Sequence, residues 1–184
     1  MKRLALFSLL AFSLLIGNFG VAPVIASFSS DTTQVSREQE VEWETYHNHK
    51  HGWSINYPPD WEVNGSDPES VIFIGKDGIN STVVCEKLPF PINVEEYFAS
   101  VSSKGSWSYS PRLSERRTEI GGESAIEVIY PIRRFPDSPL AKERRIVTTR
   151  DSIGCVIVCS APSTLYNKAD KTYFKPMIQS FKFE

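Results

Sequence analysis

The sequence predicts an α+β domain, an α/β/α sandwich in which helices cover both faces of a central, mainly antiparallel sheet. Several expected strands are apolar on both faces, whereas a sheet with one face in water alternates apolar and polar residues cleanly. Two other segments repeat apolar residues at the spacing of an amphipathic helix, so they can cover those faces. The 184 residues are enough for one domain with a substantial core.

The first strand signals come after the glycine at position 52. Residues 53–57 alternate apolar and polar side chains, two prolines end this strand, and Trp61 re-enters the core. Residues 71–74 form a continuous apolar run, which a Lys-Asp-Gly turn joins to a partner strand at 81–88. Apolar runs bounded by glycine, proline and aspartate are typical of strands.

The second group of strands is expected from two hairpins. Gly121 and Gly122 predict a turn before residues 125–130. In this strand one face carries Ile126, Val128 and Tyr130, and the other carries Ala125 and Ile129. Residues 145–150 and 153–159 flank an Asp-Ser pair, which indicates a tight hairpin. The second strand of this hairpin is apolar on both faces and therefore has to lie inside the sandwich.

Two helices are expected. The first begins after Asn93, which can form a capping box with Glu96 and precedes an apolar stripe. The second lies near the end of the chain, where Pro176 cannot occupy a helix interior because it lacks the N–H and clashes one turn back. We therefore expect a break at 171–173 and Pro176 in the first turn of a short final helix.

The beginning of the chain predicts export. Residues 1–26 have the pattern of a secretory signal peptide, because Lys2 and Arg3 precede an apolar stretch and a small-residue cleavage site. The alternative is an uncleaved membrane anchor, although the apolar stretch is short for a hydrocarbon core of about 30 Å. Residues 27–44 carry almost no apolar pattern and are expected to be a flexible arm before a single domain at 45–184. The mature protein is then extracytoplasmic: periplasmic, secreted or in a thylakoid lumen.

The net charge of the chain limits the classes of partner that we expect. The net charge is −2, and removing the leader, which holds two basic residues and no acidic one, leaves −4. Such mild acidity gives no reason to expect nucleic acid or an anionic membrane surface as a partner. We expect a monomer.

Three segments carry a family resemblance. They are Gly-Trp-Ser-Ile-Asn-Tyr-Pro-Pro-Asp-Trp at 52–61, the apolar strand at 71–74, and Met-Ile-Gln-Ser-Phe-Lys-Phe at 177–183. In these segments the chain resembles the PsbP family, the extrinsic proteins of photosystem II and their bacterial relatives. The resemblance covers residues 46–183 and implies the Mog1/PsbP-like fold.

The resemblance also implies a function. Members of this fold are typically non-enzymatic and dock on larger assemblies, and the photosynthetic members help to retain calcium and chloride at the oxygen-evolving centre. This implies a protein assembly at a membrane surface, photosystem II, as the partner, and calcium or manganese as the ions to consider. Residues 87–117 do not resemble the plant proteins, and no cysteine follows the leader as in cyanobacterial members. The alternative is a secreted domain that binds a metal or small ligand and has no role in photosynthesis.

Three histidines are candidate metal ligands. His47, His49 and His51 alternate, and on a regular strand they would project to one face as a cluster for a transition metal. The alternative is a solvated polar turn, because they precede a glycine where the strand period does not hold.

Three cysteines allow one disulfide in an exported chain. Cys155 and Cys159 are four residues apart on one expected strand, about 13 Å, which is too far for a bridge. Any bridge therefore joins Cys85 to Cys155 or to Cys159, and three buried thiols are the alternative. No cysteine is expected to act as a nucleophile, because all three lie in core-strand patterns.

Basic side chains gather in the second half of the chain. They are Arg112, Arg116, Arg117, Arg133, Arg134, Lys142, Arg144 and Arg145. If they are adjacent at a sheet edge, they form a basic surface that steers docking to an acidic partner. The alternative is ordinary surface charge that guards the edge against pairing.

No residue constellation indicates an enzyme. The segment Gly121-Gly122-Glu-Ser resembles a serine-nucleophile turn only superficially, because isoleucine occupies the position of its last glycine. We therefore expect a non-catalytic protein.

Overall fold

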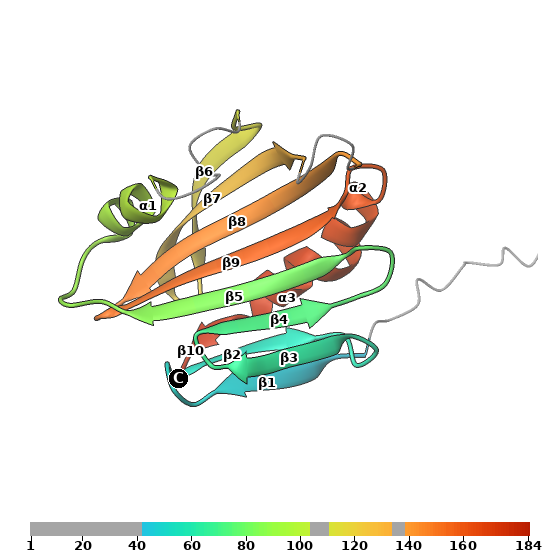
Figure 1. Cartoon of the computed structure of the whole chain (residues 1–184). Coiled ribbons are helices and arrows are strands. Elements are labelled where there is room, and N and C mark those ends of the chain that lie inside the picture. The colour runs from blue at the N-terminus through green and yellow to red at the C-terminus, as the bar shows by residue number, and fades with distance from the viewer. Residues whose placement is uncertain (1–41, 104–110, 134–138) are drawn as a thin grey trace, which may run out of the picture. The chain divides into compact units, whose positions relative to one another are not determined.

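The computed structural model describes residues 42–103, 111–133 and 139–184 (Figure 1). In chain order, the strands are β1 (Glu44–Asn48), β2 (Trp53–Tyr57), β3 (Glu62–Asp67), β4 (Ser70–Ile74), β5 (Asn80–Lys87), β6 (Ser114–Ile120), β7 (Glu123–Ile132), β8 (Ala141–Arg150), β9 (Ile153–Pro162) and β10 (Lys182–Phe183). The helical segments are α1 (Val94–Ser102), α2 (Tyr166–Ala169), the π-helical turn η2 (Asp170–Phe174) and α3 (Lys175–Ser180). In these three ranges, no helix is both long and apolar enough to cross a membrane.

The strands form two antiparallel sheets. The larger has seven strands in the order β3-β4-β5-β9-β8-β7-β6, and the smaller has three in the order β1-β2-β10. Every pairing is antiparallel, and the strands that follow one another in the larger sheet are mostly hairpin neighbours. The predicted antiparallel sheet is therefore confirmed.

The turns form where the sequence places residues that tolerate a left-handed backbone. Gly121 and Gly122 have φ of 58° and 83° and join β6 to β7. Asp151 has φ of 52° in the two-residue turn between β8 and β9. Positive φ at these positions matches the twist of the flanking strands, so both predicted hairpins are confirmed.

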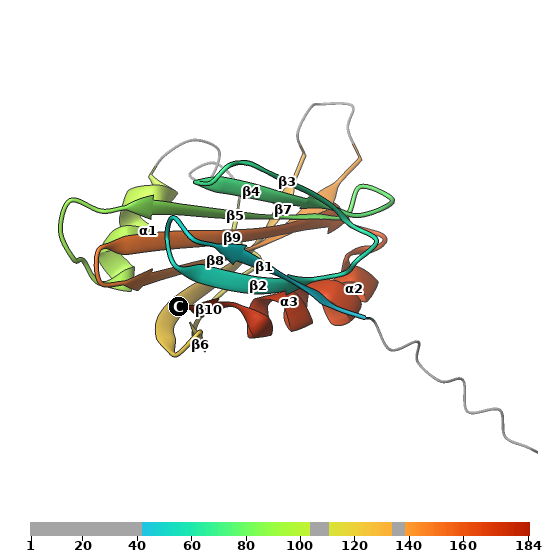
Figure 2. The ribbon, with the colours of Figure 1, turned by 90° about the horizontal axis from the view of Figure 1, so that it is seen from below.

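The larger sheet separates two apolar clusters. On one face, α1 packs over β7 and β8 against Val128, Tyr130 and Val147, all fully buried. On the other, α2, η2, α3 and the smaller sheet cover a core that includes Phe73 and Ile157. In the view of Figure 1, the α2–α3 segment lies behind the sheet, and Figure 2 shows the small sheet beside it. The predicted α/β/α class is confirmed, and the small sheet is an additional cover that the sequence did not indicate.

Helix α1 begins as predicted. The Asn93 side chain accepts a hydrogen bond from the Glu96 N–H, and the Glu96 carboxylate accepts one from the Asn93 N–H, which completes the capping box. The Tyr97 ring lies against the backbone of Gly154 on β9, where a Cβ would be 2.5 Å from the ring. A glycine at this position therefore lets α1 sit close to the sheet.

The expected break at 171–173 is wrong, because the chain stays helical through this region. The Lys175 N–H donates to the Asp170 carbonyl five residues back, which makes η2 a π-helical turn, and Pro176 lies in the first turn of α3. A proline in an α-helix clashes with the carbonyl one turn back, and the wider π-turn gives that carbonyl room.

The domain also begins earlier than predicted. Glu44, placed at the end of the flexible arm, is the first residue of β1 and accepts a hydrogen bond from the Tyr57 hydroxyl at 2.7 Å. Trp43 packs against the core beside it. The expected leader and residues 27–41 lie outside the described residues.

Candidate functional site

The three histidines are not brought together. His47 on β1 is exposed, with its Nδ1 2.8 Å from Glu184 Oε1, and its ring stacks on that of His49 at 6.3 Å. His51 is buried in the following turn, where its backbone N–H donates to the Asn48 side chain at 3.0 Å. Among the described residues, no group of three His, Cys, Asp or Glu side chains could hold a metal ion.

The cysteines divide into a bridge and a buried thiol. Cys85 on β5 and Cys155 on β9 are directly opposed, with Cα atoms 4.2 Å apart, and they form a disulfide. Cys159 is fully buried, and burial raises the pKa of its thiol to about 12. Because the thiolate is the nucleophile, Cys159 is unsuited to covalent chemistry.

The expected single basic surface does not form, because two of its members are buried. Arg144 and Arg145 are 5% and 7% exposed, and as neighbours on β8 they point to opposite faces of the sheet. Arg145 donates to Glu143 at 2.8 Å and lies over the Tyr130 ring at 4.9 Å. Neither arginine is available to a docking partner, so both leave the predicted set.

The remaining members are spread over both faces, and they make contacts of their own. Arg112 pairs with Glu115, Arg116 with Glu127, Arg117 with Glu95, and Lys142 lies over the Tyr166 ring. Arg133 is exposed, and Arg134 lies outside the described residues. Since β6 is an edge strand of the larger sheet, its charges fit the alternative interpretation that they guard this edge against pairing.

A buried ion network lies on the face opposite α1. Glu127 on β7 is 5% exposed and accepts hydrogen bonds from Arg116 Nε at 2.7 Å and from Arg144 Nη1. Arg144 Nη2 in turn lies 2.9 Å from both carboxylate oxygens of Asp170, which is 7% exposed. Lys175 Nζ ends the chain of contacts, 3.6 Å from Asp170 Oδ2.

The network fixes the charge state of its central carboxyl. Burial alone would raise the pKa of Glu127, but hydrogen bonds from Arg116 and the charge of Arg144 outweigh burial and hold this pKa below its ordinary value. Glu127 is therefore ionised at neutral pH, and it anchors the two guanidinium groups in fixed positions.

A cleft of about 460 Å³ opens over this network. The β6–β7 hairpin forms one wall and α3 the other, and Arg116, Glu127, Arg144 and Lys175 all line it. The sequence indicated Arg116 and Arg144 but missed Glu127, Asp170 and Lys175. The available signal was Glu127 itself, a charged residue within the apolar strand 125–130, since a buried charge requires a partner.

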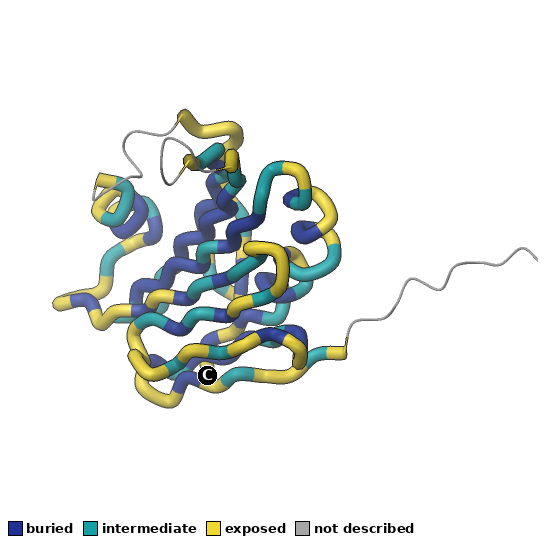
Figure 3. The backbone as a smooth tube through the Cα atoms, turned by 45° about the vertical axis from the view of Figure 1, so that its right-hand side comes forward, coloured by how far each residue is buried: buried dark blue, intermediate teal, exposed yellow. Residues whose placement is uncertain are grey.

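The other face of the sheet has an uncovered region. On β4 and β5 the side chains of Ile72, Ile74, Thr82 and Val84 point to the α1 side, but α1 packs mainly over β7 and β8. It touches β9 and β5 through Tyr97, at Gly154 and Glu86. Ile74 is 42% and Val84 37% exposed. Figure 3 shows exposed or half-buried positions alternating with buried ones along these strands. We call these four residues the open sheet face.

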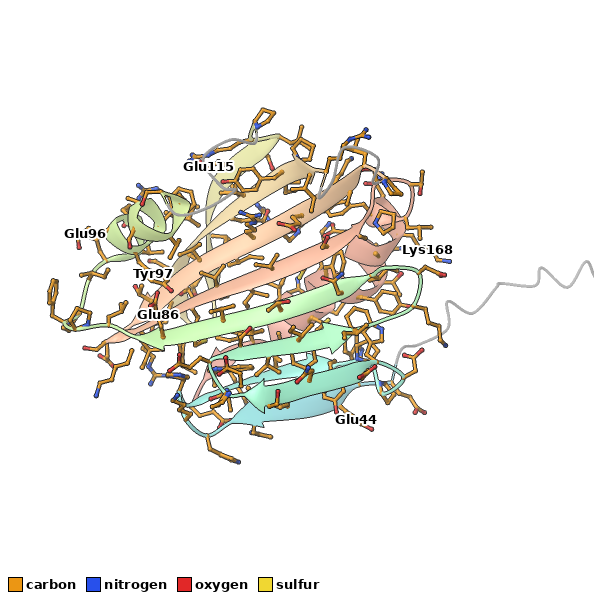
Figure 4. The ribbon with its side chains drawn as sticks, viewed as in Figure 1. Glu44, Glu86, Glu96, Tyr97, Glu115 and Lys168 are labelled. Atoms are coloured by element: carbon orange, nitrogen blue, oxygen red, sulfur yellow. A yellow bond between two sulfur atoms is a disulfide. The ribbon has the colours of Figure 1, made fainter. Side chains whose placement is uncertain are left out.

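Acidic residues flank the open sheet face. Glu62 on β3 pairs with Ile74, and Glu86 on β5 follows Val84 on the same side of the strand. Glu86 accepts a hydrogen bond from the Tyr97 hydroxyl at 3.0 Å, and Figure 4 shows the two residues where α1 approaches the sheet. The positions of β3, β4 and β5 that share this face carry no basic side chain.

Comparison with known proteins finds relatives only by structure. No protein-family model matches the chain, and no curated protein matches it by sequence. The solved structures that match include cyanobacterial PsbP (CyanoP) from Synechocystis sp. PCC 6803, with a TM-score of 0.57 and 15% identity over 78% of this chain and 94% of that one. They also include the Ran-binding protein Mog1p of Saccharomyces cerevisiae, with a TM-score of 0.53 and 9% identity over 78% of this chain and 96% of that one.

A third similar structure is LpqN of Mycobacterium tuberculosis, described as involved in cell envelope biogenesis. Its TM-score is 0.50, at 11% identity over 79% of this chain and 92% of that one. These identities are too low to carry function and establish architecture alone. The chain has the Mog1/PsbP-like fold.

Proposed function

We propose that this protein is a non-catalytic, extracytoplasmic protein that docks on a partner protein through the open sheet face. The observation that carries the proposal is the exposure of Ile74 and Val84, which flank half-buried Ile72 on a sheet surface that no helix covers in the described chain. Contiguous exposed apolar side chains on a soluble domain mark interaction sites. A partner that covers this face completes the sandwich that the apolar pattern of the strands requires.

The chemistry of the partner follows from the flanking charges. Glu62 and Glu86 border the open sheet face, and no basic side chain of β3, β4 or β5 shares it. A complementary surface therefore presents apolar side chains flanked by lysine or arginine, because opposite charges at a rim guide and orient association. Docking of this kind weakens as salt is added.

The comparisons support a protein-binding role without identifying the partner. Mog1p, which has the same fold, is described as a Ran-binding protein. The disulfide between Cys85 and Cys155 supports an oxidising compartment, in agreement with the leader pattern at 1–26. Where the host is photosynthetic, the assembly that we propose is photosystem II on its lumenal side, in line with the family resemblance and with CyanoP.

Site-specific photo-crosslinking tests the proposal in host membranes. A photoreactive amino acid is placed at position 74, at position 84, or at the control position Leu113, which is 55% exposed and lies away from the open sheet face. We expect positions 74 and 84 to capture the same protein and position 113 not to capture it. Photosystem II subunits among the products would identify the assembly; equal capture from all three positions would refute the docking surface.

Charge substitution tests the predicted complementarity against that captured partner. Both Ile74→Lys and Ile74→Asp remove an apolar contact, and we expect a loss of affinity of about tenfold or more. Ile74→Lys should weaken binding further than Ile74→Asp, because it also repels a basic rim. The reverse order, or no loss in either variant with the fold intact, would contradict the proposed partner chemistry.

A further inference from the structure

The cleft between the β6–β7 hairpin and α3 has an excess of cationic groups in its ion network. Arg116, Arg144 and Lys175 share two carboxylates, Glu127 and Asp170. Arg144 is buried and donates to both carboxylates, so its charge is matched within the protein. The unmatched charge therefore lies with the two outer members, Arg116 and Lys175, whose side chains are 61% and 55% exposed.

These two outer cations have donors left for a ligand. Arg116 uses Nε and Nη2 on Glu127, and within the described residues no bond is made by its Nη1. Among the described residues, Lys175 has one ion-pair contact, at 3.6 Å, which is longer than a hydrogen bond. Both side chains line the same cleft, so a ligand that occupies the cleft lies beside both.

The π-turn η2 explains how the helix places its part of the network. Asp170 and Lys175 are five residues apart, which in an α-helix separates two side chains by about 140° around the axis. The i→i+5 bond of η2 from Lys175 to Asp170 brings the two onto the same side. Single π-turns inside helices frequently occur at functional sites, and here the turn directs one buried carboxylate and one exposed cation to the cleft.

We propose that this cleft binds a small organic anion, whose carboxylate or phosphate group is held between Arg116 and Lys175. The guanidinium of Arg116, already fixed by Glu127, presents its remaining N–H groups in the planar geometry that suits both kinds of oxyanion. The cleft volume of about 460 Å³ falls within the range of sites for small molecules.

The site is independent of the proposed docking function. Glu127 and Arg144 project from the face of the sheet that packs on α2 and α3, whereas the open sheet face lies on the α1 side. Variants in one site therefore leave the other intact, so that failure of either proposal is recognised separately.

Isothermal titration calorimetry on the full-length chain tests the anion site, with inorganic phosphate and succinate as probes and sodium chloride at matched ionic strength as reference. We expect saturable 1:1 binding of at least one probe, and the preferred probe tells a phosphate site from a carboxylate site. Arg116→Gln and Lys175→Gln should each weaken binding about tenfold or more, because each removes a charge-assisted hydrogen bond.

The matched control is Arg117→Gln, on the same strand as Arg116 but on the opposite face and paired with Glu95. Arg117→Gln should change the affinity for the probe by less than about twofold, because it alters the net charge of the protein without removing a contact to the anion. Lys175→Gln keeps the test valid if Arg116→Gln fails to fold, because Lys175 touches the network through one long contact. Absence of saturable binding by either probe, or an equal loss in Arg117→Gln, would overturn the proposal.

Discussion

Replacing Glu127 with glutamine measures how far the fold depends on the buried ion network. The carboxylate is 5% exposed and accepts hydrogen bonds from Arg116 and Arg144. Removing one partner of a buried ion pair costs about 3–5 kcal/mol, because the other charge stays buried. Here Asp170 still holds Arg144, and the glutamine oxygen can accept one hydrogen bond in place of several.

The loss of stability expected for Glu127→Gln is therefore smaller than the roughly 3–5 kcal/mol of a fully broken buried ion pair. The Arg116 side chain is 61% exposed, so solvent screens its contact and it contributes little. We expect Glu127→Gln to lower the free energy of unfolding by about 2–3 kcal/mol. For a domain of this size, that corresponds to a fall of roughly 5–10 °C in Tm.

The loss of stability in Glu127→Gln should depend on pH, and it should be smaller at acidic pH. The pKa of Glu127 is held below its ordinary value by Arg116 and Arg144, despite burial. A carboxyl with a depressed pKa stabilises the fold above its unfolded pKa, and this stabilisation is lost as pH falls through the folded pKa. The difference between the wild type and the variant should therefore be full at pH 7 and shrink below about pH 4.

Urea denaturation followed by tryptophan fluorescence measures the difference, at pH 7 and again at acidic pH. The control is Glu119→Gln, an exposed carboxylate on β6, which should stay within about 0.5 kcal/mol of the wild type. The reasoning fails if the free energy of unfolding of Glu127→Gln also stays within about 0.5 kcal/mol of the wild type. It fails too if the difference between the two proteins grows as the pH is lowered.

Two further predictions concern the disulfide and the contact between α1 and the sheet at Gly154. Replacing Cys85 and Cys155 with alanine opens a bridge between residues 70 apart, which should cost about 4 kcal/mol in urea denaturation. Alkylation of the unreduced wild type should add no group to the native protein and one group, on buried Cys159, after denaturation, whereas three adducts would exclude the bridge. Gly154→Ala would put a Cβ 2.5 Å from the Tyr97 ring and should cost about 1–3 kcal/mol. Hydrogen exchange in α1 should then accelerate, and unchanged exchange would show that the contact does not hold the helix.

The parts of the fold that could be predicted are those determined by local sequence. The turn at Gly121 and Gly122 requires a left-handed backbone, and the Asn93 capping box is complete within one helical turn. The apolar period of β9 assigns its two faces without any knowledge of its neighbours. Strands β1, β3 and β6 were missed because each lies at a sheet edge and is mostly polar and exposed. The edge strand β10 was missed because it has only two residues.

The candidate sites depend on pairings that the sequence does not determine. Arg144 meets Glu127 only because β7 and β8 pair in one register across the connection between them. Asp170 joins them because Pro176 is accommodated by a π-turn rather than by a break. The open sheet face exists because α1 packs over β7 and β8 and leaves β4 and β5 uncovered, which the sequence interpretation, with both faces covered by helices, did not anticipate.

The two faces of the sheet suggest why this domain buries ions in a chain that already has a large apolar core. Replacing a buried ion pair with well-packed apolar residues is often neutral or stabilising, so stability alone does not favour Glu127 and Arg144 over apolar side chains at these positions. The network holds charged side chains in fixed positions. The sheet fixes Glu127 and Arg144, and the π-turn fixes Asp170. These three residues together position Arg116 and Lys175 at the cleft. A preorganised group of donors binds an anion with less loss of side-chain freedom than lysines and arginines free on a surface. We therefore propose that the ion network supports a binding site more than it stabilises the fold, and that the apolar face on β4 and β5 is the surface through which the same domain docks on its partner.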